Sequence, residues 1–249
     1  MPPEPIIFEV VMVYCFIDLD GTLISTKYNG SESDYMKVEM LSNGTYSYIT
    51  KYAYDKLFGF NERNDVEIIP ITTRSIEQYR NIVFMDFRYA LVANGGVLIE
   101  DGEINDDWFN ESTRMSVEAD KDSVIYDCYY SLKADKDVIR DVDFVNGIFL
   151  YTKSSNPAST LNRLNGGYDI SFSYKGEKLY VVPDSLSKKS AIKRFMNNRS
   201  GFIISAGDDS MLDYPMASVS DKFIFKDENN YYCDTVVDAI DIILNERKS

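Results

Sequence analysis

A short segment near the N-terminus, FIDLDGTL at residues 16–23, places two carboxylates directly behind an apolar run. The apolar run, residues 10–17, predicts a buried strand that ends at Asp18 and Asp20. Side chains two positions apart on a strand point to the same side, so both carboxylates should face one site. Two ionised carboxylates this close repel each other, so the site needs a cation or a raised pKa on one of them. Mg²⁺ suits an oxygen-only site, and an aspartate can also attack phosphorus.

Composition excludes several kinds of chemistry. The 249 residues contain no histidine, which excludes Ser-His-Asp and Cys-His catalysis and every His-ligated metal site. Acid–base work must then fall to Asp, Glu, Lys, Tyr or Cys. The balance of 26 basic against 40 acidic residues, a net charge of −14, disfavours nucleic acid and anionic membranes as partners. A small anionic substrate remains compatible, provided that a cation and a lysine lie in its site.

The same features bear on the compartment. Cys15, Cys128 and Cys233 are far apart in the sequence and fit a reducing environment. The N-terminal apolar run is interrupted by Glu9, lacks a basic leader and is too short to span a bilayer. We therefore expect a cytoplasmic protein without a membrane partner. No feature of the sequence predicts the oligomeric state.

Short apolar segments alternate with helical patterns along most of the chain. The predicted strands are residues 66–74, 89–94, 97–102, 202–206 and 222–225, and the predicted helices are residues 50–60, 76–84, 187–197 and 236–244. This alternation favours an α/β fold with a Rossmann-like, doubly wound parallel sheet and helices on both faces. Asn43-Gly44 lies between two alternating segments and predicts a hairpin over residues 37–49. Ser185 or Ser187 is a candidate cap for the helix that follows.

The pattern changes between residues 104 and 182. A predicted helix over residues 113–132 is followed by predicted strands over residues 147–152 and 178–182. We expect an inserted α+β cap lobe over residues 104–182. The core would then be discontinuous, formed by residues 1–103 and 183–249.

Four polar groups follow predicted strands or begin the next helix. They are Asp18 with Asp20; Thr72 with Thr73 and Arg74; Lys188; and Asp208 with Asp209 and Asp213. Ligands of open α/β sheets bind at the carboxyl ends of the strands, so we expect these groups to meet. The last three groups, each taken alone, are more typical of a turn or a solvated helix start. Together they favour phosphoryl transfer, which depends on positioning and charge neutralisation.

The two N-terminal carboxylates can divide the chemistry of such a transfer. Asp18 would attack phosphorus, while Asp20, kept partly protonated, would protonate the leaving oxygen and then deprotonate a water. Mg²⁺ would be held by Asp18, the backbone carbonyl of Asp20 and Asp208. The Thr72 hydroxyl would bind phosphate oxygens, and Lys188 would neutralise charge on the nucleophile and the phosphate.

The remaining acidic residues have two possible roles. Asp209 or Asp213 would either hold a metal-bound water or fix Lys188, and the sequence does not rank these two roles.

These residues resemble the motifs of the haloacid dehalogenase (HAD) superfamily. Residues 18–23 look like the first motif, Thr72 falls on the threonine of the second, Lys188 on the lysine of the third, and residues 207–213 look like the acidic fourth motif. The inserted lobe is similar to a type II cap. Residues 91–99, LVANGGVLI, look like the Asn-Gly-Ala strand of the type IIB, sucrose-phosphatase-like branch. That resemblance adds Asn94 and Gly95 to the candidate substrate-binding residues Thr72, Thr73 and Arg74.

A narrower resemblance comes with departures from the branch. Residues 69–75 and 205–213 resemble HAD proteins encoded in tellurite-resistance (TerD-type) operons. Thr73 stands where the branch usually has glycine. Asp208 and Asp213 are five positions apart rather than the commoner four, which leaves the metal ligand beyond Asp208 open. The stretch before Thr72 is longer than usual, and its predicted hairpin is either a small cover over the site or a decoration.

The resemblance implies a Mg²⁺-dependent phosphatase acting on a small phosphorylated metabolite, such as a sugar phosphate, through an aspartyl-phosphate. Two alternatives stay open: a phosphomutase of the same fold, and a non-catalytic phospho-ligand binder or signalling module. Substrate selection would fall to the cap. Its candidates, none of them preferred, are Trp108, Tyr126, Tyr129, Tyr130 and Lys153.

Overall fold

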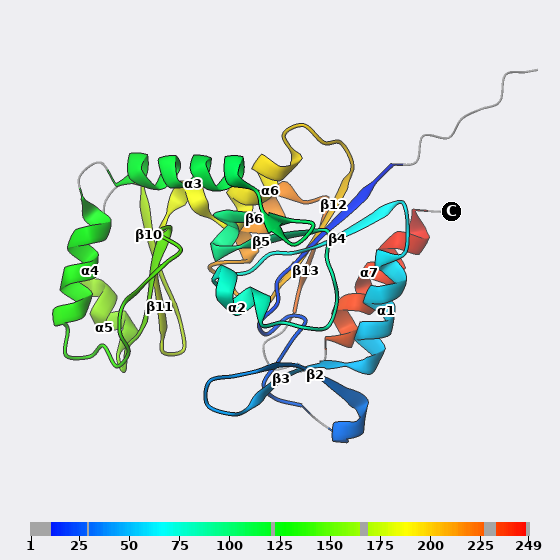
Figure 1. Cartoon of the computed structure of the whole chain (residues 1–249), viewed down its shortest axis with the longest axis horizontal. Coiled ribbons are helices and arrows are strands. Elements are labelled where there is room, and N and C mark those ends of the chain that lie inside the picture. Colours follow the sequence, from blue (N-terminus) through cyan, green and yellow to red (C-terminus); the bar gives the residue numbers. More distant parts are fainter. Residues whose placement is uncertain (1–10, 29, 121–122, 165–168, 227–232, 248–249) are drawn as a thin grey trace, which may run out of the picture.

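A parallel sheet of four strands forms the centre of the larger lobe in the computed structural model of the chain (Figure 1). In spatial order the strands are β13 (Lys222–Phe225), β12 (Phe202–Gly207), β1 (Val13–Ile17) and β4 (Val66–Pro70). All three neighbouring pairs are parallel. The structure describes residues 11–28, 30–120, 123–164, 169–226 and 233–247.

Three further strands continue this sheet beyond β4. They are β5 (Tyr89–Val92), β6 (Val97–Glu100) and β7 (Glu103–Ile104), and they pair antiparallel in chain order. A parallel bridge between Ile71 and Leu91 joins β5 to the segment that follows β4. The N–H of Thr72 also donates to the Leu91 carbonyl at 2.9 Å. This pairing fixes residues 72–74 at the carboxyl end of the sheet.

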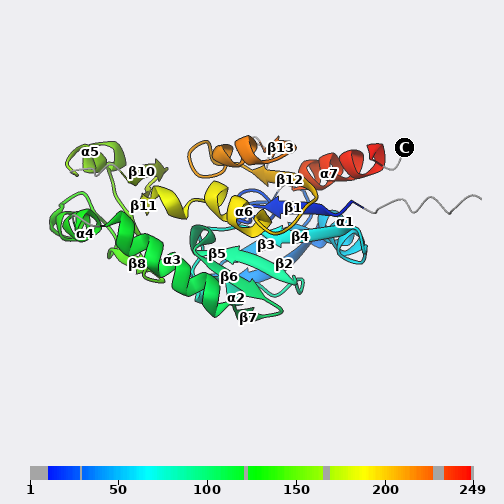
Figure 2. The same ribbon diagram turned by 90° about the horizontal axis from the view of Figure 1, so that it is seen from above.

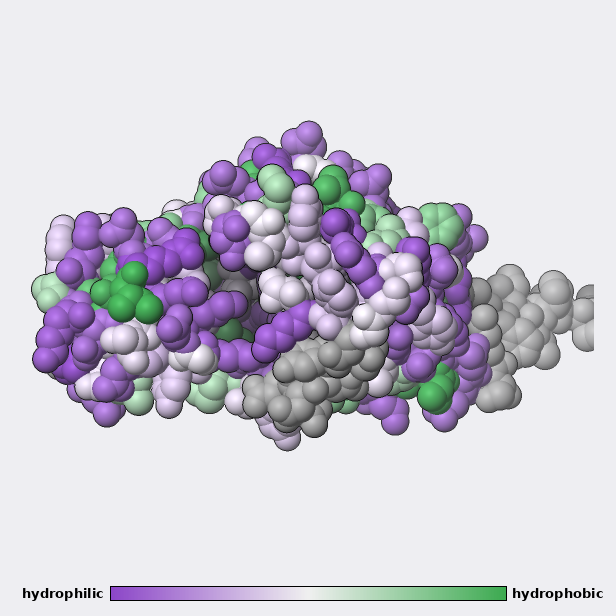
Figure 3. Space-filling model, turned by 90° about the horizontal axis from the view of Figure 1, so that it is seen from below, coloured by the Kyte–Doolittle hydropathy of each residue, from purple (hydrophilic) through white to green (hydrophobic). Residues whose placement is uncertain are grey.

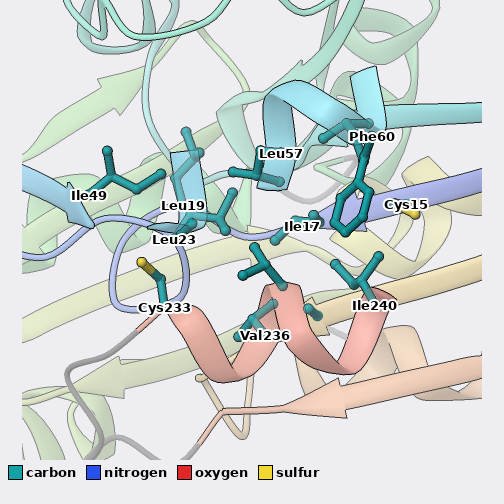
Figure 4. Packing of buried hydrophobic residues seen from close by; sticks show 14 of the residues in the cluster. Cys15, Ile17, Leu19, Leu23, Ile49, Leu57, Phe60, Cys233, Val236 and Ile240 are labelled. Carbon is teal, nitrogen blue, oxygen red and sulfur yellow. The ribbon is translucent and has the colours of Figure 1, made fainter. Parts of the chain in front are cut away.

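Helices cover both faces of the parallel sheet. Successive residues of β1 point to opposite sides and all are buried, so both faces need a covering layer. The covering helices are α1 (Lys51–Asn61), α6 (Lys188–Met196) and α7 (Asp234–Glu246). Cys15 and Ile17 lie on the side covered by α1 and α7, where they share a core cluster with Leu57 (Figure 4). Tyr14 and Phe16 lie on the opposite side, against α6. The predicted doubly wound α/β core is therefore confirmed.

Two polar caps define where the core helices begin. The Thr50 side chain accepts the Ala53 N–H at 3.0 Å at the start of α1. The Ser187 hydroxyl accepts the Ser190 N–H at 3.3 Å, and Ser190 bonds back to Ser187, which completes a capping box. Of the two candidate caps, Ser187 is thus the residue used, and Lys188 is the first residue of α6.

The smaller lobe contains an antiparallel sheet with helices on one side. Its strands, in spatial order, are β10 (Ile170–Lys175), β11 (Lys178–Pro183), β9 (Phe149–Lys153) and β8 (Asp143–Val145); its helices are α4 (Val124–Ala134) and α5 (Pro157–Asn162). Leu179 and Val181 share a cluster with Ile125 of α4. Tyr180 and Val182 alternate with them and share a cluster with core strands β5 and β6. The inserted α+β lobe is therefore confirmed, and one face of its sheet is directed at the core.

Helix α3 (Asp106–Ala119) extends from the smaller lobe onto the core (Figures 1 and 2). The Trp108 indole N–H donates to the Gly95 carbonyl at 3.0 Å, and the Arg194 guanidinium lies over the Trp108 ring at 3.8 Å. Further along α3, the Ser116 hydroxyl donates to the carbonyl of Ile148 at 3.4 Å. The predicted cap boundaries, 103/104 and 182/183, stay predictions.

Several predicted element bounds were wrong. The helix expected over residues 113–132 is two helices, α3 and α4, because α3 ends at Ala119 and Ser123 adopts a left-handed φ of 58° before α4. Helix α2 (Ile76–Arg80) is shorter than the expected helix over residues 76–84. The first strand starts at Val13, and residue 10 lies outside the described residues.

A hairpin precedes α1, as the Asn43-Gly44 signal predicted. It pairs β2 (Tyr35–Met40) with β3 (Tyr46–Thr50), and Gly44 adopts a φ of 80° in the turn. Short 3₁₀ turns complete the fold at Glu32–Asp34, Ala93–Gly95, Asp184–Leu186 and Tyr214–Val219. Among the described residues, no helix combines the length and the apolar character that a membrane span requires.

Candidate active site

Asp18 is fixed at the carboxyl end of the central strand. Its N–H donates to the Ala206 carbonyl at 2.9 Å, and its Oδ2 accepts the Thr22 hydroxyl at 3.1 Å. The intervening Gly21 adopts a φ of 91°, and a Cβ there would lie 2.1 Å from Oδ2 of Asp208. Only glycine fits this close approach, so the turn brings the loop after β12 against the loop after β1.

Lys188 joins two buried carboxylates. Its ammonium nitrogen lies 2.6 Å from Asp18 Oδ1 and 2.6 Å from Asp213 Oδ1, and its side chain is only 2% exposed. Burial disfavours the charged lysine, but the two carboxylates outweigh this and raise the pKa of Lys188. Burial raises the pKa of Asp18 to about 8; the Lys188 charge opposes this rise and the Asp213 charge adds to it.

Three neighbouring carboxylates identify a possible cation site. Carboxylate oxygens of Asp18, Asp208 and Asp213 lie within 4.8 Å of one another. Hard oxygen ligands in this number and spacing fit a divalent cation such as Mg²⁺. The donor set is therefore compatible with the predicted metal, since each of these three residues offers it one oxygen.

Asp20 has the opposite electrostatic environment from Asp18. Arg74 holds it through two parallel hydrogen bonds, Nε to Oδ2 at 2.6 Å and Nη2 to Oδ1 at 2.7 Å. Burial alone would raise the pKa of Asp20, but the hydrogen bonds and charge of Arg74 outweigh it and lower that pKa. A bidentate guanidinium favours the ionised carboxylate in this conformation, and the expected partly protonated form of Asp20 stays a prediction.

Arg74 in turn connects Asp20 to the β2–β3 hairpin. Its Nη1 donates at 2.7 Å to Glu39 of β2, which is 8% exposed and also accepts the Ser47 hydroxyl at 3.4 Å. The inserted hairpin therefore contributes a buried carboxylate next to the site. Sequence reasoning missed Glu39, since its approach to Arg74 depends on how the hairpin packs.

Residues 72–74 form the loop that we expect to bind phosphate, here called the phosphate loop, and the turn after β5 holds it in place. The N–H groups of Ala93 and Asn94 donate to the carbonyls of Arg74 and Thr72, at 2.7 and 2.8 Å. Thr72 is 1% exposed, and its hydroxyl accepts the Arg74 N–H at 3.2 Å. These contacts fix the loop beside the carboxyl end of β4.

The candidate substrate-binding residues separate into two groups. Thr73 lines the cavity described below, whereas Thr72, Arg74, Asn94 and Gly95 are not among its lining residues. The Asn94 amide donates to the Leu186 carbonyl at 3.0 Å, and the Gly95 carbonyl accepts the Trp108 indole N–H. Asn94 and Gly95 therefore hold the core together around the phosphate loop in this structure.

The three aspartates of the acidic loop after β12 make different contacts. Oδ2 of Asp213 accepts the N–H groups of Asp208 and Asp209, at 3.0 and 2.9 Å, while its Oδ1 accepts Lys188. Oδ1 of Asp209 accepts the N–H groups of Met211 and Leu212. Asp213 is thus the residue that fixes Lys188, and Asp209 caps the turn.

A cavity of about 430 Å³ lies above these carboxylates, within the size range of small-molecule sites. Its lining residues of interest are Asp18, Asp20, Lys188, Asp208, Asp209 and Asp213 from the core, and Lys175, Lys178 and Tyr180 from the cap. Seen from below, the surface is hollowed between the cap lobe, at left, and the core (Figure 3). The cavity therefore lies where the two lobes meet.

The lysines of this cavity other than Lys188 were not predicted. Lys175, at the end of β10, reaches Asp208 Oδ2 at 2.8 Å and Asp209 Oδ2 at 3.9 Å. Lys226 is buried and donates to the Gly21 carbonyl. A lysine before a glycine turn, Lys175-Gly176, was the only sequence signal for the former. The candidates Tyr126 and Tyr130 are exposed on the cap and do not line the cavity.

Comparison with solved structures identifies the fold. The chain is similar to sucrose-phosphatase from Synechocystis in complex with sucrose and phosphate, with a TM-score of 0.58, 9% identity, and 92% and 96% of the two chains covered. A trehalose-6-phosphate phosphatase related protein has a TM-score of 0.53 and 17% identity, and 95% of this chain and 100% of that chain are covered. A HAD superfamily phosphatase from Bacteroides thetaiotaomicron has a TM-score of 0.53 and 14% identity, with 96% of this chain and 98% of that chain covered. No family model matches the chain, and no curated protein matches it significantly. The chain thus has the fold of HAD phosphatases.

Proposed function

We propose that the protein is a Mg²⁺-dependent phosphatase that hydrolyses a small phosphorylated metabolite, in particular a sugar phosphate, through an aspartyl-phosphate at Asp18. The observation that carries this proposal is the contact of Asp18 with Lys188 at 2.6 Å, inside a carboxylate cluster at the floor of the cavity. The names of two proteins of similar fold, a sucrose-phosphatase and a trehalose-6-phosphate phosphatase related protein, support the sugar phosphate class.

The two carboxylates would act in sequence. An oxygen of Asp18 forms a bond to phosphorus while the bond from phosphorus to the ester oxygen breaks, and Asp20 gives that oxygen a proton. Asp20 then takes a proton from a water whose oxygen attacks phosphorus, which releases phosphate and restores Asp18. The ionised Asp20 held by Arg74 suits this second step. The first step requires a proton on Asp20 and a looser contact with Arg74.

The surrounding residues would supply charge and orientation. Lys188 offsets the charge of Asp18 and of the phosphoryl oxygens, and Asp213 positions Lys188. The phosphate would rest against the loop of Thr72 and Thr73. Mg²⁺ would be held by Asp18 and Asp208 with the Asp20 carbonyl, and it would neutralise charge on the transferring group.

Phosphate release from a panel of sugar phosphates and para-nitrophenyl phosphate tests this proposal, with Mg²⁺ and with EDTA. We expect Mg²⁺-dependent release by the wild type and a loss of at least about 10³-fold in Asp18→Asn, because the amide cannot attack phosphorus. Retained Mg²⁺-dependent turnover in Asp18→Asn would remove Asp18 as the nucleophile. Transfer of phosphate between positions of a sugar, without net release, would instead indicate the phosphomutase alternative.

Three finer expectations stay predictions. They are the narrower resemblance to HAD proteins of tellurite-resistance operons, the cytoplasmic location, and the division at residues 103/104 and 182/183.

A further inference from the structure

Three lysines stand side by side across the cap sheet. The strand register pairs Lys175 of β10 with Lys178 of β11, and Lys178 with Lys153 of β9. Directly paired residues of an antiparallel sheet present their side chains on the same face. We call Lys153, Lys175 and Lys178 the lysine row.

The lysine row lies on the face of the cap sheet that is directed at the core. Lys178 and Tyr180 are two positions apart on β11 and so point to the same face, and Tyr180 shares a core-facing cluster with Phe149 of β9. Lys175 and Lys178 both line the cavity that contains Asp18. These two lysines therefore border the same space as the proposed nucleophile, on the opposite lobe.

The charges of the row are unevenly compensated. Lys153 lies 3.8 Å from Glu177, and Lys175 lies 2.8 Å from Asp208. No carboxylate of the described residues forms an ion pair within 4.0 Å of the Lys178 ammonium. Like charges directly opposite each other on paired strands are destabilising, so an anion beside Lys178 would offset this repulsion.

We propose that Lys178, with Lys175, binds a second anionic group of the substrate, either a carboxylate or a second phosphate. This inference rests on the proposed function, in which the first phosphate lies at Asp18 and Lys188. An ammonium in a cavity between two lobes binds an anion more strongly than it does in bulk water, and the hydrogen bond is charge-assisted. A neutral sugar phosphate would leave Lys178 without this partner.

Two matched pairs of compounds test the inference. Glycerol 3-phosphate and 3-phosphoglycerate differ in a carboxylate, while fructose 6-phosphate and fructose 1,6-bisphosphate differ in a second phosphate. Their binding to Asp18→Asn is measured by calorimetry, which does not require turnover. We expect the doubly anionic member of one pair to bind about tenfold tighter or more, as one charge-assisted hydrogen bond gives. The pair that shows the preference identifies the second anion.

Variants of the row decide whether lysine is the cause. Adding Lys178→Met to Asp18→Asn should remove most of the preference, and Lys178→Arg should retain it. Lys133→Met is the matched control, because Lys133 is exposed on α4 and does not line the cavity. Circular dichroism shows whether each variant is folded.

Each outcome has a separate meaning. Equal affinity within both pairs, or a preference that survives Lys178→Met, overturns the inference. Failure of the wild type to release phosphate from any compound overturns the proposed function alone, since the calorimetric comparison still reports on Lys178.

Discussion

The core half and the cap half of the cavity hold their charges in different ways. In the core half, Lys188 is 2% exposed and lies between Asp18 and Asp213, each 2.6 Å away. In the cap half, the Lys175 side chain is 36% exposed and contacts Asp208 from the end of a hairpin strand. Strand ends and a capped helix position the first set, whereas a turn positions the second. A rigid core suits a fixed chemical step, and an exposed turn can vary with the ligand.

Removal of Lys188 from the core half should have the largest effect, on both turnover and stability. Lys188→Met leaves Asp18 and Asp213 buried without their shared cation. We expect turnover of para-nitrophenyl phosphate to fall about 10²–10³-fold, the usual effect of losing one electrostatic stabiliser. We also expect a loss of about 3 kcal/mol or more in the free energy of unfolding, measured with urea, because breaking a buried ion pair is costly.

The neighbouring lysine provides the control. Lys189 is the next residue of α6, is only partly buried and does not line the cavity. Lys189→Met removes the same charge and should leave turnover within about twofold and stability within about 0.5 kcal/mol. Equal losses in both variants would mean that the core half depends on net charge rather than on the buried contact.

The same comparison explains what the sequence could and could not predict. Asp18 and Lys188 were predictable, because a strand followed by carboxylates and a capped helix are local patterns. The ends of parallel strands bring such local patterns together whatever the loops between them do. The core half of the site was therefore largely accessible before the structure.

The remainder depended on how separate elements pack. Glu39 meets Arg74 only because the β2–β3 hairpin folds against the core. Lys175 reaches Asp208 only because one face of the cap sheet is directed at the core. Asn94 was expected at the substrate. Its side-chain amide donates to the Leu186 carbonyl, since the turn after β5 packs against the phosphate loop. None of these approaches has a local sequence signature.

Replacement of Arg74 should have an intermediate effect on turnover, because Arg74 holds Asp20. Because the guanidinium lowers the pKa of Asp20, Arg74→Met should raise that pKa. In the proposed mechanism the first step needs protonated Asp20, so the limb of the pH–rate profile that reports this form should move to higher pH. Turnover should fall about 10-fold or more, since Asp20 and Glu39 lose the group that orients them.

Arg74→Lys separates charge from geometry. Lysine keeps the positive charge but cannot make the two parallel hydrogen bonds, so its profile should lie between the other two. A profile for Arg74→Met that superimposes on that of the wild type would show that Arg74 does not control Asp20.

The smallest effect concerns the stability of the core half without metal. The pKa of Asp18 is raised to about 8 by burial, against about 4 in an unfolded chain. Between these values the native state holds a proton that the unfolded state has lost, so the free energy of unfolding falls as the pH rises. In EDTA, Asp18→Asn should remove this contribution and be more stable than the wild type at pH 8, by about 1 kcal/mol or more.

The pH series also separates Asp18 from its neighbours. The pKa of Asp208 is raised by burial, so some dependence on pH should persist in Asp18→Asn. Mg²⁺ should stabilise the wild type at pH 8 more than it stabilises Asp18→Asn, because an ion bound only by the native state adds to stability and the variant replaces a charged ligand with a neutral amide. If the wild type and Asp18→Asn lose stability in parallel from pH 5 to pH 8 in EDTA, the charge of Asp18 is already compensated by Lys188. The shared dependence on pH would then come from other buried groups, among them Asp208.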